Sequence, residues 1–86
     1  MGLDSVEFIL QVEEEFDIII DDGDAEKFRI VRDVVDYILK KKYPQQTDEF
    51  HDAVFKKLKI MIHKFVSVNE EEIKLESNFI YDLDFD

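Results

Sequence analysis

Helical spacing of apolar residues constrains the fold of this chain more than any other feature. Five apolar side chains recur every three or four residues and so share one face of a helix over about residues 48–66: Phe50, Val54, Leu58, Met61 and Phe65. Only two glycines and one proline occur among the 86 residues, which leaves few positions that favour loops. The sequence therefore predicts a single all-α domain.

Two more helices and one short helical turn are expected before this helix. Apolar spacing predicts helices over about residues 5–16 and 31–41, with Asp4 as the N-cap of the first. Residues 24–27 can form the short turn. The three isoleucines at 18–20 have no partner strand, so we expect them to form an apolar loop that plugs the core.

Residues 43–49 are the expected linker between the last two helices. Pro44 disfavours helical geometry at the residue before it. Either Thr47 or Asp48 can cap the helix that follows.

The chain ends in a long segment, residues 66–86, with little regular structure apart from an expected helical turn at 70–72. Connections of this length inside compact domains tend to be functional. Its apolar side chains are expected to anchor it to the core: Val68, Ile73, Leu75, Phe79, Ile80, Leu83 and Phe85.

The charge of the chain is strongly negative and uneven. The net charge is −11, and residues 1–26 carry ten acidic residues and no basic one. Residues 65–86 carry seven acidic residues and one lysine. This balance does not suit nucleic acid or an anionic membrane, which both need a basic surface. If the two ends meet, their acids form one surface that attracts basic partners; an ordinary solvated surface is the alternative.

The sequence carries no signature of a catalytic or metal site. It has no cysteine, and His51 and His63 lie twelve residues apart without a second histidine at ligand spacing. The acidic residues 21–24 lack the spacing of a calcium loop, although weak binding of a divalent cation remains open. No catalytic triad, P-loop or dinucleotide fingerprint is present, and no apolar run is long enough to span a membrane. We therefore predict neither an enzyme nor a metal site.

Three short motifs and the two chain ends resemble acyl carrier proteins. The motifs are E-E-E-F at 13–16, A-E-K at 25–27 and D-Y-I at 36–38. The last residues, F-I-Y-D-L-D-F-D, followed by the first, M-G-L-D-S-V-E-F, resemble that family's F-x-x-D-L-G-x-D-S-L-D-x-V-E-L segment. Residues 1–42 thus resemble the C-terminal part of the family, and residues 50–86 resemble its N-terminal helix and long loop.

The resemblance implies a small four-helix bundle, with three main helices and one short helix, in circularly permuted order. In that family the first helix runs antiparallel to the second and the last, so a short linker can join the last helix to the first. Met1 and Gly2 look like the product of a start codon and a spacer residue, which favours an engineered permutation over a natural one.

The resemblance also implies that the prosthetic group is missing. In the family, the serine of D-S-L carries 4′-phosphopantetheine. Here that slot falls between Asp86 and Leu3. Either Gly2 occupies it or the residue is absent. Ser5 is a nearby hydroxyl and is expected to be an ordinary surface serine. We therefore expect no attachment site and no cofactor on this chain.

A partner surface and an acyl cavity are implied in the same way. The surface combines acidic residues, which steer a partner, with two apolar contacts, which anchor it: Asp4, Val6, Glu7, Leu10, Glu13, Glu14 and Asp86. The core candidates, which in the family also line the acyl cavity, are Phe8, Val12, Phe16, Ile20, Ala25, Val31, Val35, Ile38, Val54, Leu58, Met61 and Phe79.

These resemblances imply a non-catalytic scaffold that docks basic patches of fatty-acid-synthesis enzymes and of a phosphopantetheinyl transferase. They also imply a location in the bacterial cytosol or an organelle matrix, and a monomer or a domain-swapped dimer. Two alternatives remain open. One is a small acidic interaction module that never carried an acyl chain, and the other is a segment of a tandem carrier array.

Overall fold

The computed structural model describes residues 3–83 and 85, with side chains for residues 5–83 and 85, and it is helical. Its elements follow in the order α1 Leu3–Phe16, α2 Asp22–Ala25, α3 Val31–Lys42, α4 Thr47–Phe65 and the 3₁₀ helix η1 Glu70–Glu72. No strand occurs within the described residues, and one isolated antiparallel bridge joins Ile30 to Asn78. The prediction of an all-α chain with three main helices and one short helix is confirmed.

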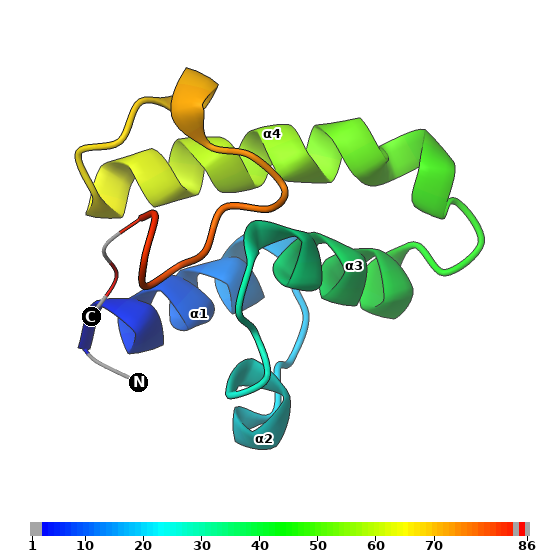
Figure 1. The fold of residues 1–86 in the computed structure, drawn as a ribbon. Helices are drawn as coiled ribbons and strands as arrows, with labels where there is room; N and C mark the ends of the chain where they lie inside the picture. Colours follow the sequence, from blue (N-terminus) through cyan, green and yellow to red (C-terminus); the bar gives the residue numbers. More distant parts are fainter. Residues whose placement is uncertain (1–2, 84, 86) are drawn as a thin grey trace.

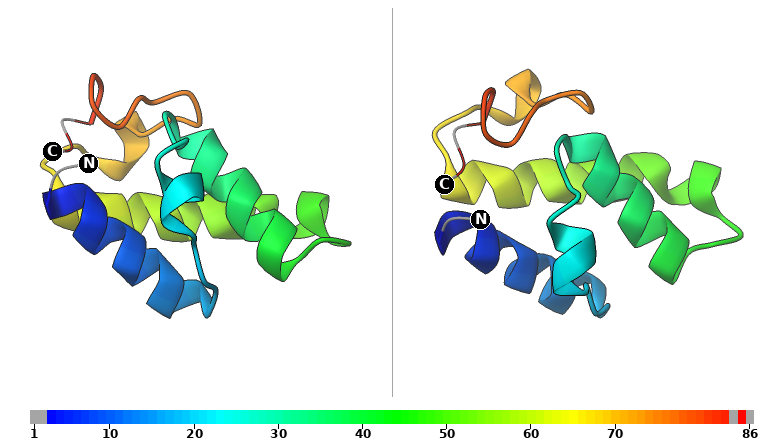
Figure 2. Two further views of the ribbon diagram at one scale, coloured as in Figure 1. Left: turned by 90° about the horizontal axis from the view of Figure 1, so that it is seen from below. Right: turned by 60° about the horizontal axis from the view of Figure 1, so that its bottom comes forward.

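The long helix α4 is the element on which the others pack. It contacts α3, α1 and η1. Figure 1 shows α4 running in the opposite direction to both α1 and α3. The short helix α2 lies on the side of α1 and α3 that faces away from α4 (Figures 1 and 2). The predicted apolar face of α4 is therefore covered by two antiparallel neighbours.

Four phenylalanines, called here the phenylalanine cluster, join the start of α1, the end of α4 and the C-terminal segment, residues 66–83 and 85. The ring centroid of Phe8 lies 5.9 Å from those of Phe65 and Phe79 and 5.3 Å from that of Phe85. Phe79 and Phe85 are themselves 5.5 Å apart. Aromatic pairs at such distances contribute about 0.5–1.5 kcal/mol each beyond their burial. The cluster therefore holds Phe85 beside the first turns of α1.

Backbone hydrogen bonds dock the C-terminal segment against the start of α3. The amide of Val31 donates to the carbonyl oxygen of Ser77 at 3.0 Å, and the amide of Arg32 donates to that of Leu75 at 2.8 Å. Amides in the first turn of a helix have no partner within the helix. The C-terminal segment supplies two of these partners, so the first turn of α3 depends on a segment more than forty residues away.

The C-terminus of α1 is completed by a side chain from α3. The last turn of α1 contains no basic residue, but Nζ of Lys42 donates to the carbonyl oxygen of Phe16 at 2.6 Å. Asp17 follows with φ 53°, in the left-handed region, and the amide of Ile18 donates back to the carbonyl oxygen of Glu13 at 3.1 Å. A cation at this end complements the helix dipole.

Two expectations about helix caps are wrong. Asp4 lies inside α1, which begins one residue earlier, so it is not the N-cap. Gln46, rather than Thr47 or Asp48, stands at the N-cap of α4. Its amide donates to the carbonyl oxygen of Tyr43 at 3.1 Å, and this turn places Thr47 in the first helical position.

The short helix and the linker also differ from their expected bounds. α2 begins two residues before the expected turn, because the carbonyl oxygen of Asp21 accepts hydrogen bonds from the amides of Asp24 and Ala25. The connection between α3 and α4 is residues 43–46, since residues 47–49 are already helical. Stacked rings of Tyr43 and Phe50, with centroids 4.5 Å apart, close this short connection.

Two apolar residues expected to pack inward are exposed. Ile20 is buried and Ile18 packs against the core, but Ile19 between them is 77% exposed. Ile80 is 63% exposed although its neighbour Phe79 packs against the core. Outside a helix, side chains that are adjacent in sequence point to different sides, so an apolar run there cannot be buried throughout.

Tyr37 links α3 to α2. Its hydroxyl donates a hydrogen bond to Oδ2 of Asp24 at 3.0 Å, and its ring lies edge-on to that of Phe28 with centroids 5.4 Å apart. Burial chiefly, and then the hydrogen bond to Asp24 and the charge of that carboxylate, raise the pKa of Tyr37 above its usual value of 10.0. The folded state thus favours the protonated phenol.

We predict that Tyr37→Phe reduces the free energy of unfolding by about 1 kcal/mol at pH 7 through the lost hydrogen bond. The folded wild type keeps the proton on Tyr37 at pH values where the unfolded chain has begun to lose it, so its stability falls above about pH 10. The variant has no such titration. The difference between the two should therefore shrink between pH 7 and pH 11 in urea unfolding followed by circular dichroism. A constant difference would contradict the prediction.

Candidate functional site

Helix α1 has apolar side chains on two faces. Phe8, Val12 and Phe16 are buried in the core, whereas Val6 is 45% and Leu10 is 56% exposed. The four-residue spacing of the exposed pair places both on one side of the helix. Two solvent-exposed apolar side chains on one helix face form a small patch of the kind that anchors a partner.

Acidic residues surround this patch. Glu7 and Glu14 are exposed, and Glu13 is half-buried. Val6, Glu7, Leu10, Glu13 and Glu14 are called here the α1 face. At the far end of the helix, Glu15 instead pairs with Lys57 of α4 at 3.4 Å. The α1 face therefore keeps its negative charge available to a basic partner.

Glu13 has a structural role that the sequence did not indicate. Its Oε2 accepts a hydrogen bond from the backbone amide of Ile20 at 2.8 Å, across seven residues of chain. This bond holds the loop after α1 against the helix and positions the buried side chain of Ile20. Glu13 consequently serves the fold whether or not a partner contacts it.

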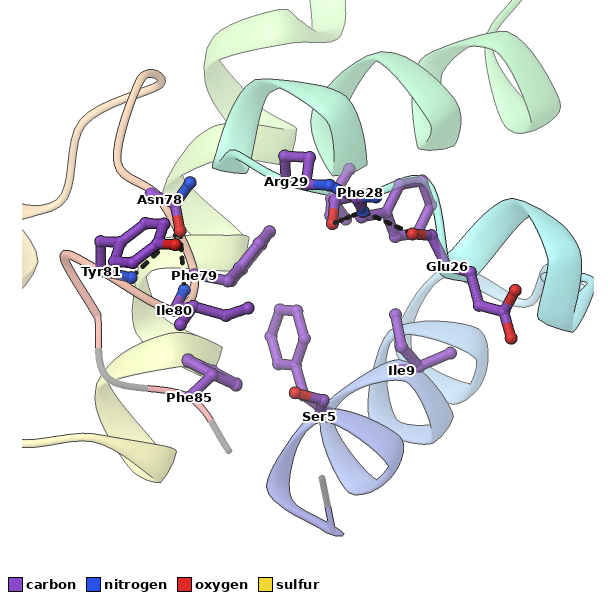
Figure 3. A pocket seen from close by; sticks show the side chains of 12 residues that line it. Ser5, Ile9, Glu26, Phe28, Arg29, Asn78, Phe79, Ile80, Tyr81 and Phe85 are labelled. Atoms are coloured by element: carbon purple, nitrogen blue, oxygen red, sulfur yellow. Dashed lines mark hydrogen bonds between the residues drawn. The ribbon is translucent and has the colours of Figure 1, made fainter. Parts of the chain in front are cut away.

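The larger pocket has a volume of about 520 Å³ and lies between α1, the loop before α3 and the C-terminal segment. Figure 3 shows Ser5 and Ile9 on the α1 side, with Phe79, Ile80 and Tyr81 on the C-terminal segment. Most of its lining is apolar. A cavity whose surface is mostly apolar suits a hydrocarbon chain or another apolar group.

Arg29 contributes a basic side chain to the lining of this pocket. Its Nη1 donates to the carbonyl oxygens of Glu26 and Phe28, which fixes the guanidinium against the loop between α2 and α3 (Figure 3). Its own amide donates to Oδ2 of Asp33 at 2.9 Å. The loop side of the pocket is therefore held in place by hydrogen bonds as well as by packing.

A second pocket of about 400 Å³ lies between α1 and α2. Leu10, Ile20 and Ala25 line it together with Glu26, which also lines the larger pocket. Ile9 is likewise shared by the two pockets. The two pockets are therefore neighbours along α1, separated by the side chains of Ile9 and Glu26.

The predicted core residues fall into two groups. All except Phe79 are buried, and Phe79 is half-buried against the core. Phe8 and Phe79 line the larger pocket, and Ile20 and Ala25 line the second. The remaining members pack in the core without lining either pocket: Val12, Phe16, Val31, Val35, Ile38, Val54, Leu58 and Met61.

Several residues that line the larger pocket were missed by the sequence analysis, among them Ile9, Phe28 and Tyr81. Ile9 follows Phe8 directly and so lies at the edge of the buried stripe of α1. Phe28 is a phenylalanine, a residue type that is often buried, although basic residues stand on both sides of it. No comparable signal distinguishes Tyr81.

The expected attachment slot lies outside the described residues. Gly2 and Asp86 are among the residues that the structure leaves undescribed, and Leu3 and Asp4 are described only as part of the backbone of α1. The expected roles of these four residues at the attachment slot and on the partner surface therefore stay predictions.

Within the described residues, no group of three or more histidine, aspartate or glutamate side chains is arranged to hold a metal ion. None of the described helices has the length and apolar character needed to cross a membrane.

We predict that Glu13→Ala reduces the free energy of unfolding by about 1–2 kcal/mol, because the partly buried amide of Ile20 loses its acceptor. The exposed neighbour Glu14 offers a matched control, and Glu14→Ala should change stability by less than about 0.5 kcal/mol. Urea unfolding at pH 7 measures both. Equal effects of the two substitutions would show that the hydrogen bond contributes nothing.

No protein-family model and no solved structure matches this sequence. Among curated proteins, the chain matches acyl carrier proteins of Chlorobium phaeobacteroides, Chlorobium phaeovibrioides and Chlorobium luteolum. Each is 54% identical over 40 residues, which make up 46% of this chain and 51% of the relative. The chain thus spans about half the length of the curated relatives it matches. Over those 40 residues, the chain is related to acyl carrier proteins.

Proposed function

We propose that this chain is a docking protein of the acyl carrier type that presents the α1 face to basic enzymes of fatty acid synthesis and carries no acyl chain. The observation that supports it most is the exposure of Val6 and Leu10 among acids on a helix whose opposite side is fixed in the core. Charge brings the partner to the helix, and the apolar pair holds it there. The proposed location is the bacterial cytosol or an organelle matrix.

A circularly permuted order is part of this proposal. Residues 1–42 resemble the C-terminal part of acyl carrier proteins, and residues 50–86 resemble their N-terminal part. The antiparallel course of α4 against α1 and α3 agrees with that arrangement (Figure 1). A connection of only four residues, 43–46, suffices to join α3 to α4.

The phenylalanine cluster favours a permuted domain over a segment of a tandem array. Phe8 near one end of the described chain packs directly on Phe79 and Phe85 near the other. In a tandem array, each of these residues would have its partner in a neighbouring repeat. Here one chain closes its own core.

The absence of a prosthetic group follows from chemistry at the expected slot. A phosphoester requires a hydroxyl group, and Gly2 has none. We predict that incubation with coenzyme A and a phosphopantetheinyl transferase leaves the intact mass unchanged. Gly2→Ser should gain one phosphopantetheine under the same conditions. A gain of mass by the wild type would contradict the proposal and direct attention to Ser5.

Docking is tested by reversing charge on the α1 face. We predict that Glu7→Lys with Glu14→Lys weakens binding to a bacterial β-ketoacyl synthase by about tenfold or more and flattens its dependence on salt. Glu70→Lys with Glu71→Lys makes the same change of charge on η1, away from α1 (Figure 1), and should have a small effect. Isothermal titration calorimetry at several salt concentrations measures both. If both pairs of substitutions weaken binding equally, the net charge of the chain, and not the α1 face, accounts for the affinity.

A further inference from the structure

Two adjacent side chains of the C-terminal segment stand out into solvent. Tyr81 is 86% exposed, and Ile80 before it is also exposed. Phe79 before the pair packs against the core, and Leu83, two residues after it, is buried, whereas Asp82 between Tyr81 and Leu83 is exposed. An exposed tyrosine beside an exposed isoleucine presents apolar surface of the kind found at contact surfaces.

Hydrogen bonds hold the turn that carries this pair. The side-chain oxygen Oδ1 of Asn78 accepts hydrogen bonds from the amides of Ile80 and Tyr81 at 2.9 and 3.0 Å. In return, Oδ2 of Asp82 accepts from the amide of Asn78 at 2.7 Å, and the amide of Leu83 donates to the carbonyl oxygen of Asn78 at 3.0 Å. The two exposed side chains are therefore held out by a fixed backbone, which lowers the entropy lost on binding.

The turn faces α1 across the larger pocket. Ile80 and Tyr81 line that pocket on one side, and Ser5 and Ile9 line it on the other (Figure 3). Ile9 also borders the second pocket, next to Val6 and Leu10. Apolar surface thus continues from Tyr81 through the pocket to the α1 face.

The charged side chains around this apolar surface determine which kind of partner can bind it. Asp82 in the turn, Glu26 at the pocket and Glu7 on α1 are exposed acids, and acids outnumber the basic side chain of Arg29, which also lines the pocket. In a symmetric dimer each patch would face its own copy, which would bring these acids together in a chain of net charge −11. A protein surface with an apolar recess flanked by basic side chains complements the patch in both respects.

We propose that Ile80 and Tyr81 form a second apolar anchor, so that one basic protein partner contacts the 78–82 turn and the α1 face together. The inference rests on the docking function proposed above and adds to it a contact outside α1. Tyrosine is well suited to such an anchor, because it supplies a large contact area with few rotatable bonds.

The test compares three variants in calorimetric titrations with the bacterial β-ketoacyl synthase. Ile80→Ser with Tyr81→Ser should raise the Kd by about tenfold or more, with the salt dependence unchanged because no charge is altered. Leu10→Ser should weaken binding similarly. Ile19→Ser, which removes another exposed isoleucine from a different loop, should leave the Kd unchanged. Thermal unfolding should show all three as stable as the wild type.

The outcomes separate the two proposals. If Leu10→Ser weakens binding and the Ile80/Tyr81 variant does not, the second anchor is wrong while docking through α1 stands. If the wild type does not bind the synthase, the docking function fails and the second anchor with it. Sedimentation equilibrium of the chain alone should give a monomer. If the wild type is a dimer and the Ile80/Tyr81 variant is a monomer, this surface binds a second copy of the chain, and the proposal of a basic partner is wrong.

Discussion

The contact of Phe8 with Phe65, Phe79 and Phe85 supports most of what is distinctive in this structure. These rings fix the start of α1 to the end of α4 and bring the C-terminal segment back over both. The larger pocket is lined by three of these rings, those of Phe8, Phe79 and Phe85. The turn that displays Tyr81 continues directly from Phe79. The α1 face and this turn therefore share one apolar support, and their relative positions are set by it.

Much of the helical structure could be predicted from local sequence. The spacing of Phe8, Val12 and Phe16, and of the apolar residues of α4, depends only on which side chains recur each turn. The starts of α2 and α4 were predicted less well, because they depend on turn hydrogen bonds to Asp21 and Tyr43 that apolar spacing does not indicate. The start of α3 was predicted correctly at Val31, although its first turn takes its hydrogen-bond acceptors from Leu75 and Ser77.

The candidate site was predictable only in part, and its parts differ in how far the sequence indicates them. The α1 face followed from a resemblance and from the contrast between exposed and buried residues on one helix. Ile80 was expected to anchor its segment to the core because it is apolar. The residue type alone does not show whether the side chain points into the core or into solvent. Its exposure results from the Asn78 and Asp82 side chains, which set the turn through hydrogen bonds. Of the expected cavity residues, Phe8 and Phe79 line the larger pocket, but its full lining could not be predicted, since its walls come from three distant parts of the chain.

The docking of the C-terminal segment onto α3 has a consequence for synthesis on the ribosome. The chain emerges from its N-terminus, so α1 and α3 are complete long before residues 75–85 exist. Until then the amides of Val31 and Arg32 have only water as acceptor, and Phe8 lacks the ring of Phe85. Cooperative folding must therefore await the synthesis of residues 75–85. Until these residues have left the ribosome, a growing chain exposes the apolar surfaces of α1 and α3, to which a chaperone can bind.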